Sequence, residues 1–166
     1  RGVVDESNRD VERGLGIHVE LVGWEDTLPG AGRPQELINV DVDDCQLFVG
    51  VLWKRWGTPP GNGSSSGFEE EFLRAKTRKA ETGIPEIWLA FKHVDEVTLA
   101  DPGEQLRQVI HFRGAQKQVR EILFKEFVDT QDWEAKLRGW LSRSIVREGV
   151  ATLRSTTVTE RIDIVS

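Results

Sequence analysis

Several residue types that would point to particular functions are scarce in this chain of 166 residues. It has a single cysteine, Cys45, which excludes an internal disulfide and favours a reducing, cytoplasmic location. Its three histidines, His18, His93 and His111, are scattered and show no metal-ligand spacing. We therefore expect neither a metal site nor a bound cofactor.

A net positive charge and long apolar runs are also missing. The formal net charge is −6, and the cations are interspersed with acids, whereas a sequence-independent nucleic-acid surface needs clustered Lys and Arg. No apolar run approaches the roughly 20 residues of a membrane helix, and no signal peptide is recognisable. Neither nucleic acid nor a membrane is therefore expected as a partner.

Methionine is absent, and the first recognisable element, residues 3–14, reads as the end of a helix. A doubly wound α/β domain normally begins with a strand. We therefore expect that the first strand of the domain is missing from this chain and that the chain is a fragment of a longer protein.

Apolar β-runs alternate with amphipathic segments along the sequence. The predicted strands are residues 17–24, 46–53, 86–92 and 122–127, and the predicted helices are residues 3–14, 33–43, 67–81, 104–118 and 129–147. This alternation predicts a flavodoxin-like or TIR-like three-layer α/β domain over residues 1–147, with all strands parallel. Residues 148–166 are expected to form a linker or an added edge strand.

The most informative segment is residues 45–75. A near-continuous apolar strand leads into a loop rich in Gly, Pro and Ser, and the loop leads into a helix that begins with Glu69, Glu70 and Glu71. Ligands of open α/β sheets bind where strands end and helices begin. An acidic first turn is also common simply because it complements the helix dipole, and that structural explanation stays open.

Helix geometry separates the three glutamates. At roughly 100° per residue, Phe68 and Phe72 share the face that must pack on the sheet. Glu71 lies on the flank of that face, about 60° from Phe68, whereas Glu70 points nearly the opposite way. We therefore expect Glu71 to face the crevice at the sheet edge, and Glu70 to face solvent with Arg74 as its i,i+4 partner.

Five further residues are candidates for substrate binding. Trp56 and Gly57 open the Gly/Pro/Ser loop and Ser66 closes it, while Asp26 and Arg33 follow the predicted strand at residues 17–24. An indole can stack on a nicotinamide or adenine ring, and an arginine can hold a phosphate bidentately. The structural alternatives are that Trp56 anchors the loop and that Arg33 forms a surface ion pair. Trp53 is expected to continue the strand core.

Five sequence motifs together resemble the TIR-like domains found at the N-terminus of NACHT and other STAND-type ATPases. They are WEDTLPGAGRPQELIN, DVDDCQLFVGVLWKRWGTPPG, SGFEEEFLRA, GIPEIWLAFK and LFKEF. The wider group includes TIR domains that cleave NAD with a helix glutamate. It is also similar to nucleoside deoxyribosyltransferases, whose catalytic glutamate sits in a Gly-Thr-x-x-Glu-x-x-x-Ala frame.

The resemblance implies a role for one glutamate. Placing Gly67 and Ala75 on the glycine and alanine of that frame puts Glu71 on the catalytic glutamate, with Phe68 in place of the threonine. The expected function is an N-terminal signalling module of a STAND-type ATPase that cleaves NAD or a related N-glycoside through Glu71. The alternative is a non-enzymatic adaptor. Expected partners are the parent ATPase, a second copy that pairs sheet edges, and an NAD-like small molecule.

Overall fold

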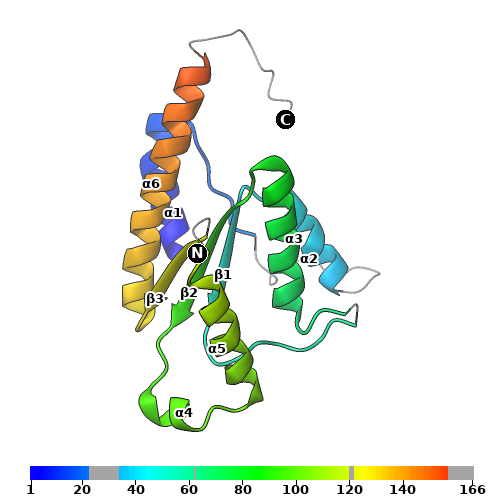
Figure 1. The fold of residues 1–166 in the computed structure, drawn as a ribbon. Helices are drawn as coiled ribbons and strands as arrows, with labels where there is room; N and C mark the ends of the chain where they lie inside the picture. The colour runs from blue at the N-terminus through cyan, green and yellow to red at the C-terminus, as the bar shows by residue number, and fades with distance from the viewer. Residues whose placement is uncertain (23–33, 62, 120–121, 157–166) are drawn as a thin grey trace. The chain divides into compact units, whose positions relative to one another are not determined.

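The computed structural model describes residues 1–22, 34–61, 63–119 and 122–156 (Figure 1). The chain divides into two compact units, which are described separately. One combines Arg1–Leu21 with the C-terminal segment that starts at Thr130, and the other is Val22–Asp129. The candidates Asp26 and Arg33 lie outside the described residues.

The first unit is a helix pair. Helix α1 (Gly2–Leu15) packs against α6 (Thr130–Thr156), and an ion pair of 2.6 Å joins the carboxylate of Glu6 to the guanidinium of Arg138. Helix α6 runs past the predicted end at residue 147, so residues 148–156 continue a helix. Residues 157–166 of the predicted linker or edge strand lie outside the described part of the chain.

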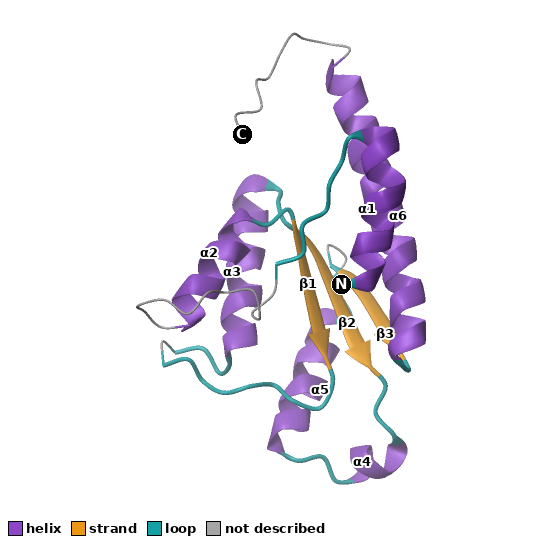
Figure 2. Ribbon diagram, turned by 180° about the vertical axis from the view of Figure 1, so that it is seen from behind, coloured by secondary structure: helices purple, strands orange, loops and turns teal. Residues whose placement is uncertain are grey.

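The second unit holds the sheet. Its elements are α2 (Pro34–Asp44), β1 (Leu47–Leu52), α3 (Gly67–Thr82), β2 (Glu86–Lys92), α4 (Glu96–Ala100), α5 (Glu104–Gln116) and β3 (Leu123–Phe127). The strands are parallel in the order β1-β2-β3 (Figure 2). Leu47 is paired with Glu86, and Trp88 is paired with Leu123. The prediction of a flavodoxin-like α/β fold with a parallel sheet flanked by helices is therefore confirmed.

Helices α3 and α5 share one hydrophobic core with the sheet. Alternation along β1 turns Phe48, Gly50 and Leu52 into this core. Phe72 and Ala75 enter it from α3, and Leu106, Val109 and Phe112 enter it from α5. Because both crossover helices bury their apolar faces in the same cluster, the packing of this face of the sheet fixes the position of α3.

The predicted strand at residues 17–24 is not formed in its described part. Residues 17–22 have no regular secondary structure, and residues 23 and 24 are not described. The side-chain amide of Asn8 accepts from the backbone N–H of Val19 and donates to its carbonyl oxygen, at 2.8 Å each. These bonds satisfy the main-chain N–H and C=O of Val19 without a neighbouring strand. The apolar pattern of residues 17–24 therefore wrongly predicted a strand.

The prediction for Trp53 is also wrong. Strand β1 ends at Leu52, and Trp53 is 46% exposed, whereas Trp56 is only 5% exposed. The ammonium groups of Lys54 and Lys92 lie 4.9 Å and 4.3 Å from the centre of the Trp53 ring. The alternation of the strand turns Trp53 away from the core, and the loop brings Trp56 back into it.

Helix α4, which the sequence pattern did not predict, begins at a capping aspartate. Both the backbone N–H and the hydroxyl of Thr98 donate to the carboxylate of Asp95 at 2.8 Å. These bonds, with a smaller contribution from Lys54, lower the pKa of Asp95 from 3.8 to about 2.

We expect carboxyl-carbon NMR to give Asp95 a pKa near 2. Because the pKa is lower in the folded state, the cap stabilises α4 above pH 3.8 and is lost as the pH falls from 3.8 towards 2. In a Thr98→Val variant the pKa should move part of the way back towards 3.8, since the hydroxyl donor is removed while the backbone N–H donor remains. An unshifted Asp95 in the unmodified chain would contradict this assignment.

Candidate functional site

The candidate site lies where β1 ends and α3 begins. Because α3 connects two parallel strands, its N-terminus lies at the carboxyl edge of the sheet (Figure 1). Gly57 and Ser66 meet there: a Cβ placed on Gly57, whose φ is +105°, would lie 3.3 Å from Cβ of Ser66. The structure therefore brings together Trp56, Gly57 and Ser66, three of the predicted residues.

A chain of hydrogen bonds fastens the loop to the first turn of α3. Ser66 is the N-cap, and its fully buried hydroxyl accepts from the backbone N–H of Glu69 at 3.0 Å. The carboxylate of Glu69 accepts from the N–H and the hydroxyl of Ser65, at 2.6 Å and 2.7 Å. The indole N–H of Trp56 donates to the same hydroxyl at 2.7 Å. These polar groups hold the loop in place.

Gln105 on α5 completes this attachment, and the sequence analysis missed it. Its side-chain oxygen accepts from the backbone N–H groups of Trp56 and Gly57, at 2.9 Å and 2.8 Å, and its amide nitrogen donates to the Gly57 carbonyl at 3.0 Å. A lone glutamine in the first turn of a helix carries no sequence signal for such a role. Only the tertiary structure brings α5 beside the loop.

Aromatic rings fill the space between the end of β1 and the two helices. The Phe68 ring lies edge-on to Trp56 and to Phe112, with centroid distances of 5.6 Å and 5.5 Å. Phe112 also packs against Trp56 at 5.1 Å and Phe72 at 5.0 Å. Gly50 of β1 leaves room for the Phe68 ring, because a Cβ on Gly50 would lie 2.8 Å from that ring. We call Trp56, Phe68, Phe72 and Phe112 the aromatic cluster.

Glu71 lies in the second turn of α3, one residue before Phe72 of this cluster. Its side chain is partly buried, while its helix neighbour Phe72 is fully within the core. Glu69 and Glu70 are partly buried as well, so the position of Glu71 on the flank of the buried face stays a prediction. The predicted approach to Arg33 or Asp26 falls on residues outside the described part of the chain.

The prediction that Glu70 faces solvent is wrong. One oxygen of its carboxylate accepts from the Asn39 side-chain amide of α2 at 2.7 Å, and the other is buried without a hydrogen-bond partner. Helix α2 packs on this side of α3, and the single-helix argument could not include it. Arg74 forms its hydrogen bonds with Asp43, to which its guanidinium donates twice at 2.5 Å. The charge of Glu70 makes only a smaller contribution to the raised pKa of Arg74.

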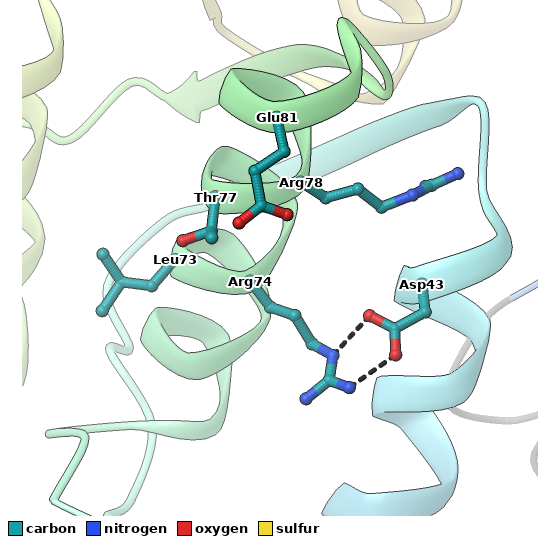
Figure 3. Close-up of a pocket in the computed structure, with 6 residues that line it drawn as sticks. All are labelled: Asp43, Leu73, Arg74, Thr77, Arg78 and Glu81. Carbon is teal, nitrogen blue, oxygen red and sulfur yellow. Dashed lines mark hydrogen bonds and ion pairs between the residues drawn. The ribbon is translucent and has the colours of Figure 1, made fainter.

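A shallow hollow of about 500 Å³ lies between α2 and α3. Figure 3 shows its lining residues, which are Asp43, Leu73, Arg74, Thr77, Arg78 and Glu81. Both of its arginines serve to hold α2. The hydrogen bonds from Arg74 lower the pKa of Asp43, and Arg78 donates to the Cys45 carbonyl at 2.5 Å. This hollow is therefore a joint between two helices, and it does not include Glu71.

Cys45, at the end of this joint, is a packed thiol. Burial raises its pKa above the ordinary value, and the thiol donates to the Val42 carbonyl at 3.3 Å. Among the described residues, no group of three or more His, Cys, Asp or Glu side chains is placed to hold a metal ion. The described helices also include none that is long and apolar enough to cross a membrane.

Comparison with known proteins gives one match. The model of a family described as a domain of unknown function, DUF4062, matches residues 3–142 of this chain. No curated protein and no solved structure matches it.

Proposed function

This chain belongs to the DUF4062 family of domains of unknown function, and we propose that it is the N-terminal signalling module of a STAND-type ATPase and acts in the cytoplasm through protein–protein association. The resemblance of its motifs to TIR-like domains supports the context. The observation that favours association over catalysis is the aromatic cluster at the carboxyl edge of β1.

A sugar that reacts at Glu71 would approach at the carboxyl edge of β1, and the aromatic cluster lies at that edge. Phe68 stands where the deoxyribosyltransferase frame has a hydroxyl, and its ring packs against Trp56 and Phe112. Trp56 is itself buried, and its indole N–H is already bonded to Ser65. Stacking of Trp56 on a nicotinamide ring, or bonding of Ser66 to a ribose, would require this packing to open.

Cleavage of NAD or a related N-glycoside is the second candidate function. It is favoured by the partly buried position of Glu71 in the second turn of α3. A carboxylate there can stabilise the positive charge that develops on a ribosyl ring when its N-glycosidic bond breaks. In this mechanism Glu71 is the catalytic residue, and Arg33 and Asp26 bind the substrate.

Association and catalysis predict different results in an activity assay. The assay uses the protein dimerised by a fused dimerisation domain. We expect no release of nicotinamide from NAD and no cleavage of nucleosides above the level of a Glu71→Ala variant. The parent ATPase should bind the module in sedimentation experiments. The Glu71→Ala variant should bind it equally well.

Turnover that is lost in Glu71→Ala would establish the enzyme instead. The matched control is Glu81→Gln, because Glu81 is an exposed carboxylate on the same helix. Glu70→Ala is not a suitable control, since Glu70 is bonded to Asn39 and its loss would disturb the α2–α3 joint.

A further inference from the structure

Trp56 is the one large apolar side chain buried among the described residues of the loop between β1 and α3. It is 5% exposed, whereas Arg55, Thr58 and Pro59 around it are exposed. The apolar contact of this part of the loop with the core therefore depends on a single indole ring.

The two ends of the loop are fixed by polar contacts of their own. At the end of β1, the ammonium of Lys54 donates to the Thr98 hydroxyl at 3.3 Å. At the start of α3, the N–H and the hydroxyl of Ser65 donate to the Glu69 carboxylate at 2.6 Å and 2.7 Å. Residues 55–61 lie between these fixed points, so they can move without a change in β1 or α3.

Gln105 supplies the main-chain attachment of this segment. Its three hydrogen bonds, of 2.8–3.0 Å, go to the backbone of Trp56 and Gly57, and Gln105 is itself exposed. Water replaces exposed hydrogen bonds at little cost, and a segment with few buried apolar contacts opens locally at low free energy. The main remaining cost of opening is the space that the indole would leave behind.

That space has two aromatic walls and one polar end. The Trp56 ring contacts Phe68 at 5.6 Å and Phe112 at 5.1 Å between centroids, and its N–H donates to the Ser65 hydroxyl at 2.7 Å. We call the space lined by Phe68, Phe112 and Ser65 the ring slot. Its walls belong to α3 and α5, and Ser65 is bonded to Glu69. The slot therefore keeps its lining when residues 55–61 move.

The lining defines what can replace the indole. Two phenyl walls favour a flat aromatic ring system of the same two-ring size. The Ser65 hydroxyl accepts the present N–H, so a ring without a donor loses this bond. The Glu69 carboxylate, 2.7 Å from the same hydroxyl, disfavours an anionic ring. The ring slot therefore selects a neutral two-ring heteroaromatic group with an N–H donor.

We propose that Trp56 is a gate and that the ring slot is a ligand-binding site. When residues 55–61 carry the indole out of the core, a neutral, flat two-ring heteroaromatic molecule takes its place and donates its N–H to Ser65. The Gln105 bonds keep the site closed in the absence of ligand. The site needs neither Glu71 nor the proposed signalling role, so the absence of an ATPase partner or of NAD turnover leaves it standing.

The binding test compares free indole with indene, which has the same shape but a CH₂ group in place of the N–H. NMR titrations give the Kd for the variants Trp56→Ala, Gln105→Ala and Gln108→Ala. Gln108 is the matched control, because its side chain is bonded to Glu104 and not to the loop.

We expect indole to bind Trp56→Ala with a Kd below about 1 mM and indene to bind it about five-fold more weakly. The Kd of indole should be about ten-fold lower for Gln105→Ala than for Gln108→Ala, because loss of the three bonds raises the population of the open state. Hydrogen exchange of the Trp56 indole N–H should be about ten-fold faster in Gln105→Ala, with the amide of Leu89 in β2 unchanged.

Three results would overturn the proposal. If indole binds Trp56→Ala but binds Gln105→Ala no better than Gln108→Ala, Trp56 is a fixed part of the core and not a gate. If Leu89 exchanges faster by the same factor as Trp56, the opening is unfolding of the whole domain. Equal binding of indole and indene would remove the role of Ser65. Should Trp56→Ala not fold, the comparison of Gln105→Ala with Gln108→Ala, made with both probes, decides on its own.

Discussion

Replacing Phe112 with alanine should lower the free energy of unfolding by about 3–4 kcal/mol. Phe112, like Phe68, is in contact with all three other members of the aromatic cluster. It also packs against Phe91 of β2 at 6.3 Å. Its removal would leave a cavity between α3, α5 and the sheet that rigid rings cannot easily close. Urea unfolding followed by tryptophan fluorescence measures the change.

The matched control is Ile110→Ala on the same helix. Ile110 is among the exposed apolar residues, so its truncation should cost less than about 1 kcal/mol. If the two variants lose equal stability, the aromatic cluster is not the centre of this core. The Phe112 variant should also loosen the loop at Trp56, which amide exchange at Gly57 would detect.

The second large effect is expected at Gly50, where local preference and packing predict opposite signs. Valine is favoured over glycine in strands, so the sequence alone predicts that Gly50→Val stabilises β1. In the structure a Cβ at this position would lie 2.8 Å from Phe68 Cε2 and 2.8 Å from Leu89 Cδ2. We expect the variant to lose about 2–3 kcal/mol of stability in urea unfolding, because overpacking displaces both side chains.

The neighbouring position provides a comparison in the same strand. Val51 is half-exposed on the opposite face, so Val51→Ile should change stability by less than about 0.5 kcal/mol. A stabilised Gly50→Val protein would mean that Phe68 does not pack over Gly50. In that case the carboxyl edge of β1 would have room beside Glu71, which would strengthen the case for catalysis.

The amino-acid sequence by itself determined the class of fold. The apolar runs at β1, β2 and β3 and the amphipathic segment of α3 were predicted within one or two residues, because each pattern has the period of its own element. The sequence also identified the segment that carries the candidate site. These features depend on residues close together in the chain.

Only the tertiary structure decided which side chains meet. In the structure Glu70 is hydrogen-bonded to Asn39 and Arg74 to Asp43. Trp53 is exposed, and the side chain of Gln105 is hydrogen-bonded to the loop. The partners of Glu70 and Arg74 both lie in another helix, α2, more than thirty residues away in the chain. Periodicity describes one helix or strand at a time, whereas the surroundings of a side chain depend on which other elements pack beside it.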